Sequence, residues 1–243
     1  MAIPHRNSPM QPLSSAERRA MYLDIMRRRV RAGSGSSLQL LLARESCPMP
    51  DLNALLSGER YVVVGGTATS LYMPLRTTKD VDILVSEQDA SLVEQALLKA
   101  GASKIGSLGF TSSLGLGGTS WALADDTELD VLLSGHAWVK HALAHPNRDA
   151  AGLPIVALPY LVLMKLDASR SMDVGDLGRM LGGASEADLA KVRTVVKKHL
   201  PEASEDLESL IQLGKLEFQS APLAVPPGPN ASLPDTGEKG QTF

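Results

Sequence analysis

Two aspartates stand one residue apart in the segment RTTKDVDILV, at positions 76–85, directly before an apolar run. Side chains alternate faces along a β-strand, so Asp80 and Asp82 point one way and Val81 points the other. Two carboxylates a few ångströms apart repel, and the pKa of each rises unless a cation or hydrogen-bond donors compensate. Mg²⁺ binds one or two carboxylates together with substrate phosphates, and therefore suits such a pair. A solvated, structural pair of acids is the alternative, and the pair by itself leaves both open.

A diglycine turn precedes the acid pair. Gly65-Gly66-Thr67 closes the apolar strand YVVV and begins a helix. Glycines at a strand-to-helix turn let backbone N–H groups approach a phosphate, and the helix N-terminus adds a favourable dipole. When the glycines are taken alone, a simple tight turn is the better explanation. The strand-turn-helix-strand order, however, carries the turn and the acids to one edge of a sheet, which favours a phosphate donor lying between the glycines and a metal.

A third acid follows in ELDVLL, at positions 128–133. Asp130 is embedded in a short strand, and Glu128 on the same strand face is the substitute candidate. In-line phosphoryl chemistry between two Mg²⁺ ions needs carboxylates that bridge both metals and one that holds the metal activating the attacking hydroxyl. Asp80 and Asp82 are expected to take the first role and Asp130 the second.

These motifs resemble those of the nucleotidyltransferase superfamily that includes DNA polymerase β. That pattern is an apolar strand, Gly-Gly or Gly-Ser, a spacer, Asp-x-Asp with apolar neighbours, and a later single acid; here it reads VVVGGTATSLYMPLRTTKDVDILV, with ELDVLL following. The form Gly-Gly-Thr-Ala with Arg-x-Thr-x-Asp-x-Asp looks most like the bacterial abortive-infection and type IV toxin nucleotidyltransferases and the minimal nucleotidyltransferases. The resemblance covers about residues 60–180.

The resemblance implies a fold and an activity. The fold is α/β (α+β), with a small mixed sheet, flanking helices and a helical C-terminal part. The activity is Mg²⁺-dependent transfer of a nucleoside monophosphate from an NTP such as ATP to a hydroxyl, on an RNA end such as that of tRNA, a protein or a small molecule. A toxin-like member would have a cognate antitoxin. The alternative is a catalytically silent protein of the same fold that binds nucleotide or a partner, although the presence of all three acids argues against it.

The helices after the sheet supply further candidates through the same resemblance. Lys165 is expected to reach triphosphate oxygens as a catalytic point charge, and Asp176 to orient it or Arg170. Ordinary surface ion pairs among Lys165, Arg170, Asp173 and Asp176 are the alternative. Around the acid pair, Arg76 and Lys79 are expected to contact phosphate or acceptor. The complete set of expected nucleotide-binding residues is Gly65, Gly66, Thr67, Arg76, Lys79 and Asp176.

The elements that must position these residues divide the chain into five parts. Composition and periodicity predict a disordered N-terminus (1–13), a helical N-terminal arm (14–58), an α/β core (59–158), a helical region (159–218) and a disordered tail (219–243). Within the core, strands are expected from residue 61, at 81–85, 119–124 and 128–133, and helices at 67–72 and 86–100. The arm carries an Arg-rich helix face that could hold RNA backbone, but a merely solvated face is the commoner explanation.

The composition limits the classes of protein to which the chain could belong. With 243 residues, 44% apolar and 21% charged, and a net charge of -3, the chain reads as a soluble globular protein with no overall attraction to nucleic acid. Its single cysteine, Cys47, can form neither an internal disulfide nor a thiol metal site, which favours a reducing cytoplasm. The most apolar stretch, 153–164, is short and cut by two prolines, so no membrane span is expected. The GLGG segment at 115–118 lacks the rest of a phosphate-loop motif and predicts a hairpin or loop.

Overall fold

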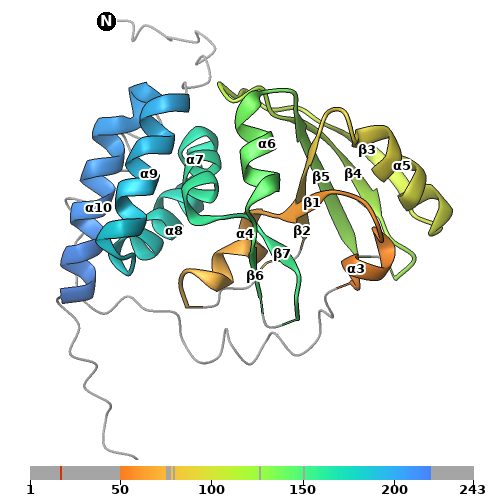
Figure 1. The fold of residues 1–243 in the computed structure, drawn as a ribbon, viewed down its shortest axis with the longest axis horizontal. Coiled ribbons are helices and arrows are strands. Elements are labelled where there is room, and N and C mark those ends of the chain that lie inside the picture. Colours follow the sequence, from red (N-terminus) through yellow and green to blue (C-terminus); the bar gives the residue numbers. More distant parts are fainter. Residues whose placement is uncertain are drawn as a thin grey trace, which may run out of the picture.

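The computed structural model describes Glu17 and residues 50–74, 78, 80–125, 127–149 and 151–219. The expectations for the N-terminal arm before residue 50, for Arg76 and Lys79, and for the tail beyond residue 219 therefore lie outside the described residues. Over those ranges the fold is mixed α/β, as the sequence predicts, with one seven-stranded sheet, flanking helices and a helical C-terminal part (Figure 1).

The sheet has the strand order β3-β4-β5-β2-β1-β7-β6. The strands are β1 (Tyr61–Val63), β2 (Val81–Ser86), β3 (Ser103–Leu108), β4 (Gly117–Ala122), β5 (Glu128–Ser134), β6 (Asn147–Arg148) and β7 (Pro154–Ile155). β2 runs antiparallel to β1 and parallel to β5, while β4 pairs antiparallel with both β3 and β5. The outer strand β3 carries an irregularity between Lys104 and Gly106.

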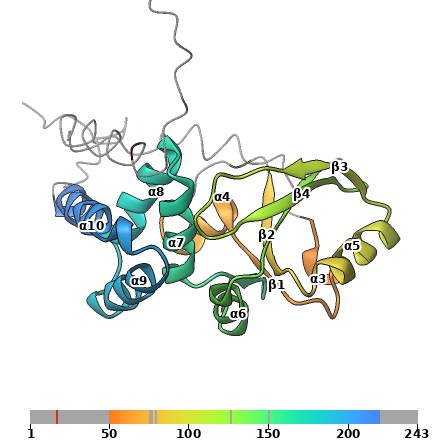
Figure 2. The ribbon, with the colours of Figure 1, turned by 90° about the horizontal axis from the view of Figure 1, so that it is seen from above.

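Helices surround the sheet unevenly. They are α3 (Leu52–Leu55), α4 (Gly65–Ala68), α5 (Ala90–Lys99), α6 (Ala137–Ala144), α7 (Leu158–Ala168), α8 (Ser171–Gly182), α9 (Glu186–His199) and α10 (Ser204–Gln219), with short 3₁₀ turns at Thr69–Leu71 and Pro201–Ala203. Seen from above, α3, α5 and α6 lie along one side of the strands, and α7–α10 gather at one end of the molecule (Figure 2). None of the described helices is long and apolar enough to cross a membrane.

The C-terminal helices pack closely because small residues meet between them. A Cβ on Gly214 of α10 would overlap the backbone carbonyl of Gly178 in α8, so only glycine allows this approach. In α7 every residue from Leu161 to Asp167 is buried, which ties the bundle into the same continuous core as the sheet. The chemistry-bearing residues of α7 and α8 therefore belong to helices that share one continuous core with the sheet.

Several boundaries differ from those predicted. The helix expected at 67–72 is α4 followed by a 3₁₀ turn, and the helix expected from Ser86 begins only at Ala90. Ser86 ends β2, and its hydroxyl donates to Asp89 Oδ2 at 2.7 Å, so a turn separates strand from helix. β3, β6 and β7 were not predicted. β3 reads SKIGSL and is mostly exposed, so it lacks the apolar run that marks a buried strand.

Candidate active site

Three carboxylates converge on the sheet. Asp80, Asp82 and Asp130 each offer an oxygen, and these oxygens all lie within 4.8 Å of one another. The strand register brings two of them together, because β2 and β5 are parallel neighbours in which Asp82 lies directly opposite Asp130. Asp80 lies two residues before Asp82, just before β2 begins, and two residues along a strand return the side chain to the same face. The Thr78 hydroxyl donates to Asp80 Oδ1 at 2.8 Å. The expected convergence is confirmed, while metal binding by these acids stays a prediction.

The environment of Asp82 strongly disfavours its charged form. Burial, followed by the negative charges of Asp80 and Asp130, raises the pKa of the Asp82 carboxyl from 3.8 to about 6. The cations of Arg170 and Lys165 act in the opposite direction without cancelling the effect. Such a site gains from any added positive charge.

The environment of Asp130 also disfavours its charged form. Burial raises the pKa of its carboxyl, and the charges of Glu128 and Asp80 add to the rise. The hydroxyl of Ser120, the residue opposite Asp130 on β4, opposes this by hydrogen bonding, but it has one proton and also donates to Glu128 Oε1 at 2.9 Å. Within the described part of the chain, Asp130 Oδ1 is buried and has no hydrogen-bond partner.

These observations fit a divalent cation. Mg²⁺ is a hard ion that takes carboxylate oxygens, and three carboxylates converge here, with raised pKa values at Asp82 and Asp130 and one buried Asp130 oxygen that lacks a partner among the described residues. A buried acceptor without a partner costs on the order of 1–3 kcal/mol, which a bound cation would remove. Glu128, the substitute candidate, is exposed, paired with Ser120 and not part of the cluster.

The diglycine turn has a structural role that the sequence did not predict. Gly65 has φ +61°, in the left-handed region, and a Cβ there would overlap the carboxylate of Asp82. The residue before Gly65 also contacts this strand, because the Val64 N–H donates to the Asp82 carbonyl at 2.9 Å. Gly65 thus makes room for the acid. Phosphate binding by Gly65, Gly66 and the largely buried Thr67 stays a prediction.

Lys165 lies in a buried ion network. Its Nζ donates to Asp173 Oδ1 and to Asp176 Oδ2, each at 2.8 Å, and its side chain is 4% exposed. The ion pairs of the alternative interpretation exist, but those of Lys165 are buried and do not lie on the surface. Asp173 is buried too, but Lys165 and Arg170 outweigh burial and hold the pKa of its carboxyl below the ordinary value. Contact of Lys165 with a triphosphate, and the orienting role of Asp176, stay predictions.

Arg170 is the exposed member of this network. Its Nε donates to Asp173 Oδ2 at 2.7 Å, while its side chain is 73% exposed. The hydrogen bond to Asp173 raises the pKa of the guanidinium most, and the negative charges of Asp173, Asp82 and Asp80 add to the rise. Sequence reasoning did not include Arg170 among the binding residues. In the structure Arg170 lies at the corner between two helices, directly after Ser169, which ends α7 at φ +50° and turns the chain into α8.

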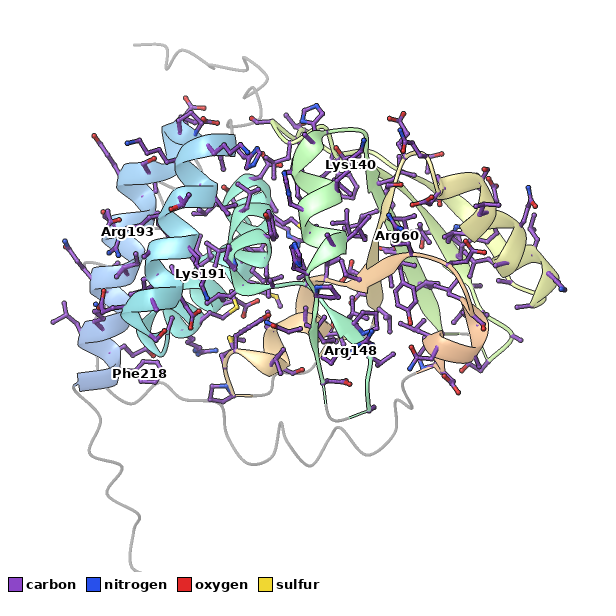
Figure 3. All side chains as sticks on the ribbon, in the orientation of Figure 1. Arg60, Lys140, Arg148, Lys191, Arg193 and Phe218 are labelled. Carbon is purple, nitrogen blue, oxygen red and sulfur yellow. The ribbon has the colours of Figure 1, made fainter. Side chains whose placement is uncertain are left out.

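Other features of the sequence lie away from the acids. The GLGG segment ends in β4, where a Cβ on Gly118 would come within 2.7 Å of a backbone carbonyl, so its glycine pair Gly117-Gly118 belongs to the sheet. A cavity of about 310 Å³ beside the start of β1 has a lining that includes Arg60, Tyr61 and Arg148. Arg60 and Arg148 are labelled in Figure 3. None of the acid triad lines this cavity.

Comparison with known proteins adds little to the geometry. No protein-family model matches the chain, and no curated protein is significantly similar to it in sequence. Among solved structures, TM1012 from Thermotoga maritima, provisionally described as a nucleotidyltransferase, is 17% identical, with a TM-score of 0.36 over 52% of this chain and 87% of its own. ANT(2″)-Ia, solved in complex with adenylyl-2″-tobramycin, is 14% identical, with a TM-score of 0.36 over 75% of this chain and 99% of its own. Likenesses at this level assign no function.

Proposed function

We propose that this protein is a Mg²⁺-dependent nucleotidyltransferase that moves a nucleoside monophosphate from an NTP to a hydroxyl acceptor and releases pyrophosphate. The observation that carries the proposal is the convergence of Asp80, Asp82 and Asp130 within 4.8 Å. The raised pKa of Asp82 and the unpartnered oxygen of Asp130 support it, because both conditions are relieved by a cation.

Each residue has a defined task in this proposal. Asp80, Asp82 and Asp130 would hold the Mg²⁺ ions, Asp80 and Asp82 as the shared ligands and Asp130 as the ligand of the ion that activates the acceptor hydroxyl. When bound, the ions supply Lewis-acid stabilisation of the triphosphate and lower the pKa of the acceptor hydroxyl. Gly65 leaves the space that the Asp82 carboxylate occupies. The exposed guanidinium of Arg170, anchored by Asp173, presents charge suited to phosphate oxygens.

The acceptor and the cellular setting belong to the same proposal. We propose the end of an RNA such as tRNA, or a protein hydroxyl, as acceptor, and a cognate antitoxin as partner. The support is the resemblance of the Gly-Gly-Thr-Ala and Asp-x-Asp segments to toxin nucleotidyltransferases. A cytoplasmic location suits the single cysteine.

Label transfer tests the proposal. The protein is incubated with each α-labelled NTP, Mg²⁺, and total RNA or total protein as acceptor. Label is expected in one macromolecular fraction, and it should fall at least about a hundredfold in Asp80→Ala and Asp130→Asn, since loss of a metal ligand exceeds the effect of losing an outer-shell partner. Glu94→Ala is the matched control, because it removes an exposed carboxylate that pairs with Lys104 and lies outside the acid triad.

Two results would contradict the proposal. Tight binding of Mg²⁺ and NTP without transfer to any acceptor would identify the silent, nucleotide-binding alternative. Transfer that persists in both triad variants would show that the acids do not hold the catalytic metals.

A further inference from the structure

The loop between β3 and β4, residues 109–116, is fastened to helix α7 by one buried carboxylate. Asp167 is 2% exposed. Ser112 Oγ donates to its Oδ2 at 2.5 Å, and the Ser113 N–H donates to its Oδ1 at 2.9 Å. Both carboxylate oxygens are therefore used by a segment more than fifty residues earlier in the chain.

The loop itself has a single, well-defined construction. Ser112 Oγ also accepts the backbone N–H groups of Leu114 and Leu116, at 3.1 and 3.3 Å. The Leu114 side chain is buried, and its carbonyl accepts from the Ser134 hydroxyl and the Trp138 indole. One side of the loop is thus bound to the β5–α6 segment and the other to α7. Loop 109–116 is a fixed bridge between the sheet and the C-terminal helices.

Stability alone does not account for Asp167. Among the described residues it forms no ion pair, so its two hydrogen bonds come from neutral donors. A buried carboxylate in such surroundings carries a desolvation cost that a well-packed apolar side chain would avoid. The carboxylate instead orients the loop, because its two hydrogen bonds fix the loop against one particular turn of α7.

That turn leads directly to the exposed cation of the site. Asp167 lies between Lys165 and the corner residue Ser169, whose N–H donates to the Lys165 carbonyl at 3.0 Å. Arg170 follows, its Nε anchored to Asp173 Oδ2 at 2.7 Å, and its positive charge opposes the rise in the pKa of Asp82. On the other side of the bridge, β4 continues from the loop to Ser120, opposite Asp130.

We infer that Asp167 is a positioning residue for nucleotidyl transfer: it locks loop 109–116 to α7 and so fixes Arg170 relative to the acid triad. The inference rests on the proposed function for its kinetic consequence, but the mechanical link stands on the hydrogen bonds. A misplacement of about 1 Å in a group that positions substrate can cost on the order of a hundredfold in rate. Loosening the bridge is therefore expected to lower kcat/KM about 10- to 100-fold.

The variants are chosen to keep the fold intact. Asp167→Asn retains an acceptor for the Ser113 N–H and changes only the partner of the Ser112 hydroxyl. Ser112→Ala removes that hydroxyl and leaves the carboxylate, so it serves if the first variant does not fold. Ser86→Ala is the matched control, because it deletes a similar serine–aspartate hydrogen bond at the far end of β2.

A double-variant cycle separates positioning from general destabilisation. If Asp167 acts through Arg170, then Asp167→Asn should reduce kcat/KM strongly in the wild-type background and by less than about twofold in the Arg170→Ala background. Reductions that multiply, or wild-type rates in both Asp167→Asn and Ser112→Ala, would overturn the inference. Ser86→Ala should retain wild-type kinetics.

Amide hydrogen exchange tests the link without any activity. In Asp167→Asn, exchange is expected to accelerate at residues 109–116 and also at 169–173, with neither segment affected in Ser86→Ala. Acceleration confined to the loop would overturn the inference, since the corner carrying Arg170 would then be held by other contacts. If the wild-type protein transfers no nucleotide, the proposed function fails, and exchange at 169–173 still decides whether Asp167 fixes the corner.

Discussion

Replacing Asp82 by asparagine should stabilise the protein in the absence of divalent cations while removing its activity. The pKa of this carboxyl is about 6 in the folded protein against an ordinary 3.8, a difference of about 2 units. At 1.36 kcal/mol per unit, the charged carboxylate costs the folded state at most about 3 kcal/mol. Asparagine has nearly the same shape and carries no charge.

The sign of the pH dependence follows from the raised pKa. The folded state binds the Asp82 proton more tightly than the unfolded state, so this group's contribution to stability is fully present below about pH 4 and is lost as the pH rises through about 6. Asp82→Asn does not undergo this loss. The difference in unfolding free energy between variant and wild type should therefore grow between about pH 4 and pH 6 and level off above about pH 7.

Urea unfolding with a chelator present, at a series of pH values, measures this difference. A second series with excess Mg²⁺ should stabilise the wild-type protein above pH 6 and reverse the order of the two proteins, because ligand that binds only the folded state adds stability by mass action. A difference that does not change with pH, or a wild-type protein that is the more stable at pH 8 without Mg²⁺, would refute the electrostatic account of the site.

Four further substitutions test three separate parts of the structure. Gly65→Ala should abolish Mg²⁺-dependent stabilisation in a thermal-shift titration, since its Cβ would displace the carboxylate of the neighbouring acid; wild-type stabilisation would contradict this placement. Lys165→Met should lower the unfolding free energy by about 3–5 kcal/mol in urea, because the buried carboxylates of Asp173 and Asp176 lose the Lys165 ammonium, although Asp173 keeps its ion pair with Arg170; a change below about 1 kcal/mol would contradict this account of the buried ion network. Gly214→Ala should lower Tm because its Cβ meets a backbone carbonyl of α8, whereas Gly175→Ala, with open space around it, should stabilise by about 0.5–1 kcal/mol; equal effects would refute the close packing of α8 on α10.

The acid triad could be predicted from the sequence because it depends on short-range rules. Alternation along a strand places Asp80 and Asp82 on one side, and the apolar run of ELDVLL marks a second buried strand that brings Asp130 beside them. Strong apolar strands of this kind sit at the centre of the sheet. The outer strand β3, which reads SKIGSL, carries no such signal and was missed.

The rest of the site depends on contacts between distant segments, which spacing does not reveal. Periodicity places Lys165 on a helix, but only the packing of α8 shows that its ammonium is buried between two acids. The role of Gly65 required knowledge of where the Asp82 side chain points across the strand pair. The bridge from Asp167 to Ser112 joins residues whose types are ordinary in helices and loops, so nothing in either segment marks it.

The irregular outer strand has a consequence for how the protein behaves at high concentration. β3 pairs only with β4 among the strands that the structure describes, and an open strand edge is a template for pairing between molecules. The register shift at Lys104 and Gly106 bends that edge, and the charged Lys104 side chain lies at the same place. A second copy of the chain therefore meets a broken row of hydrogen-bonding groups, which opposes aggregation through this edge.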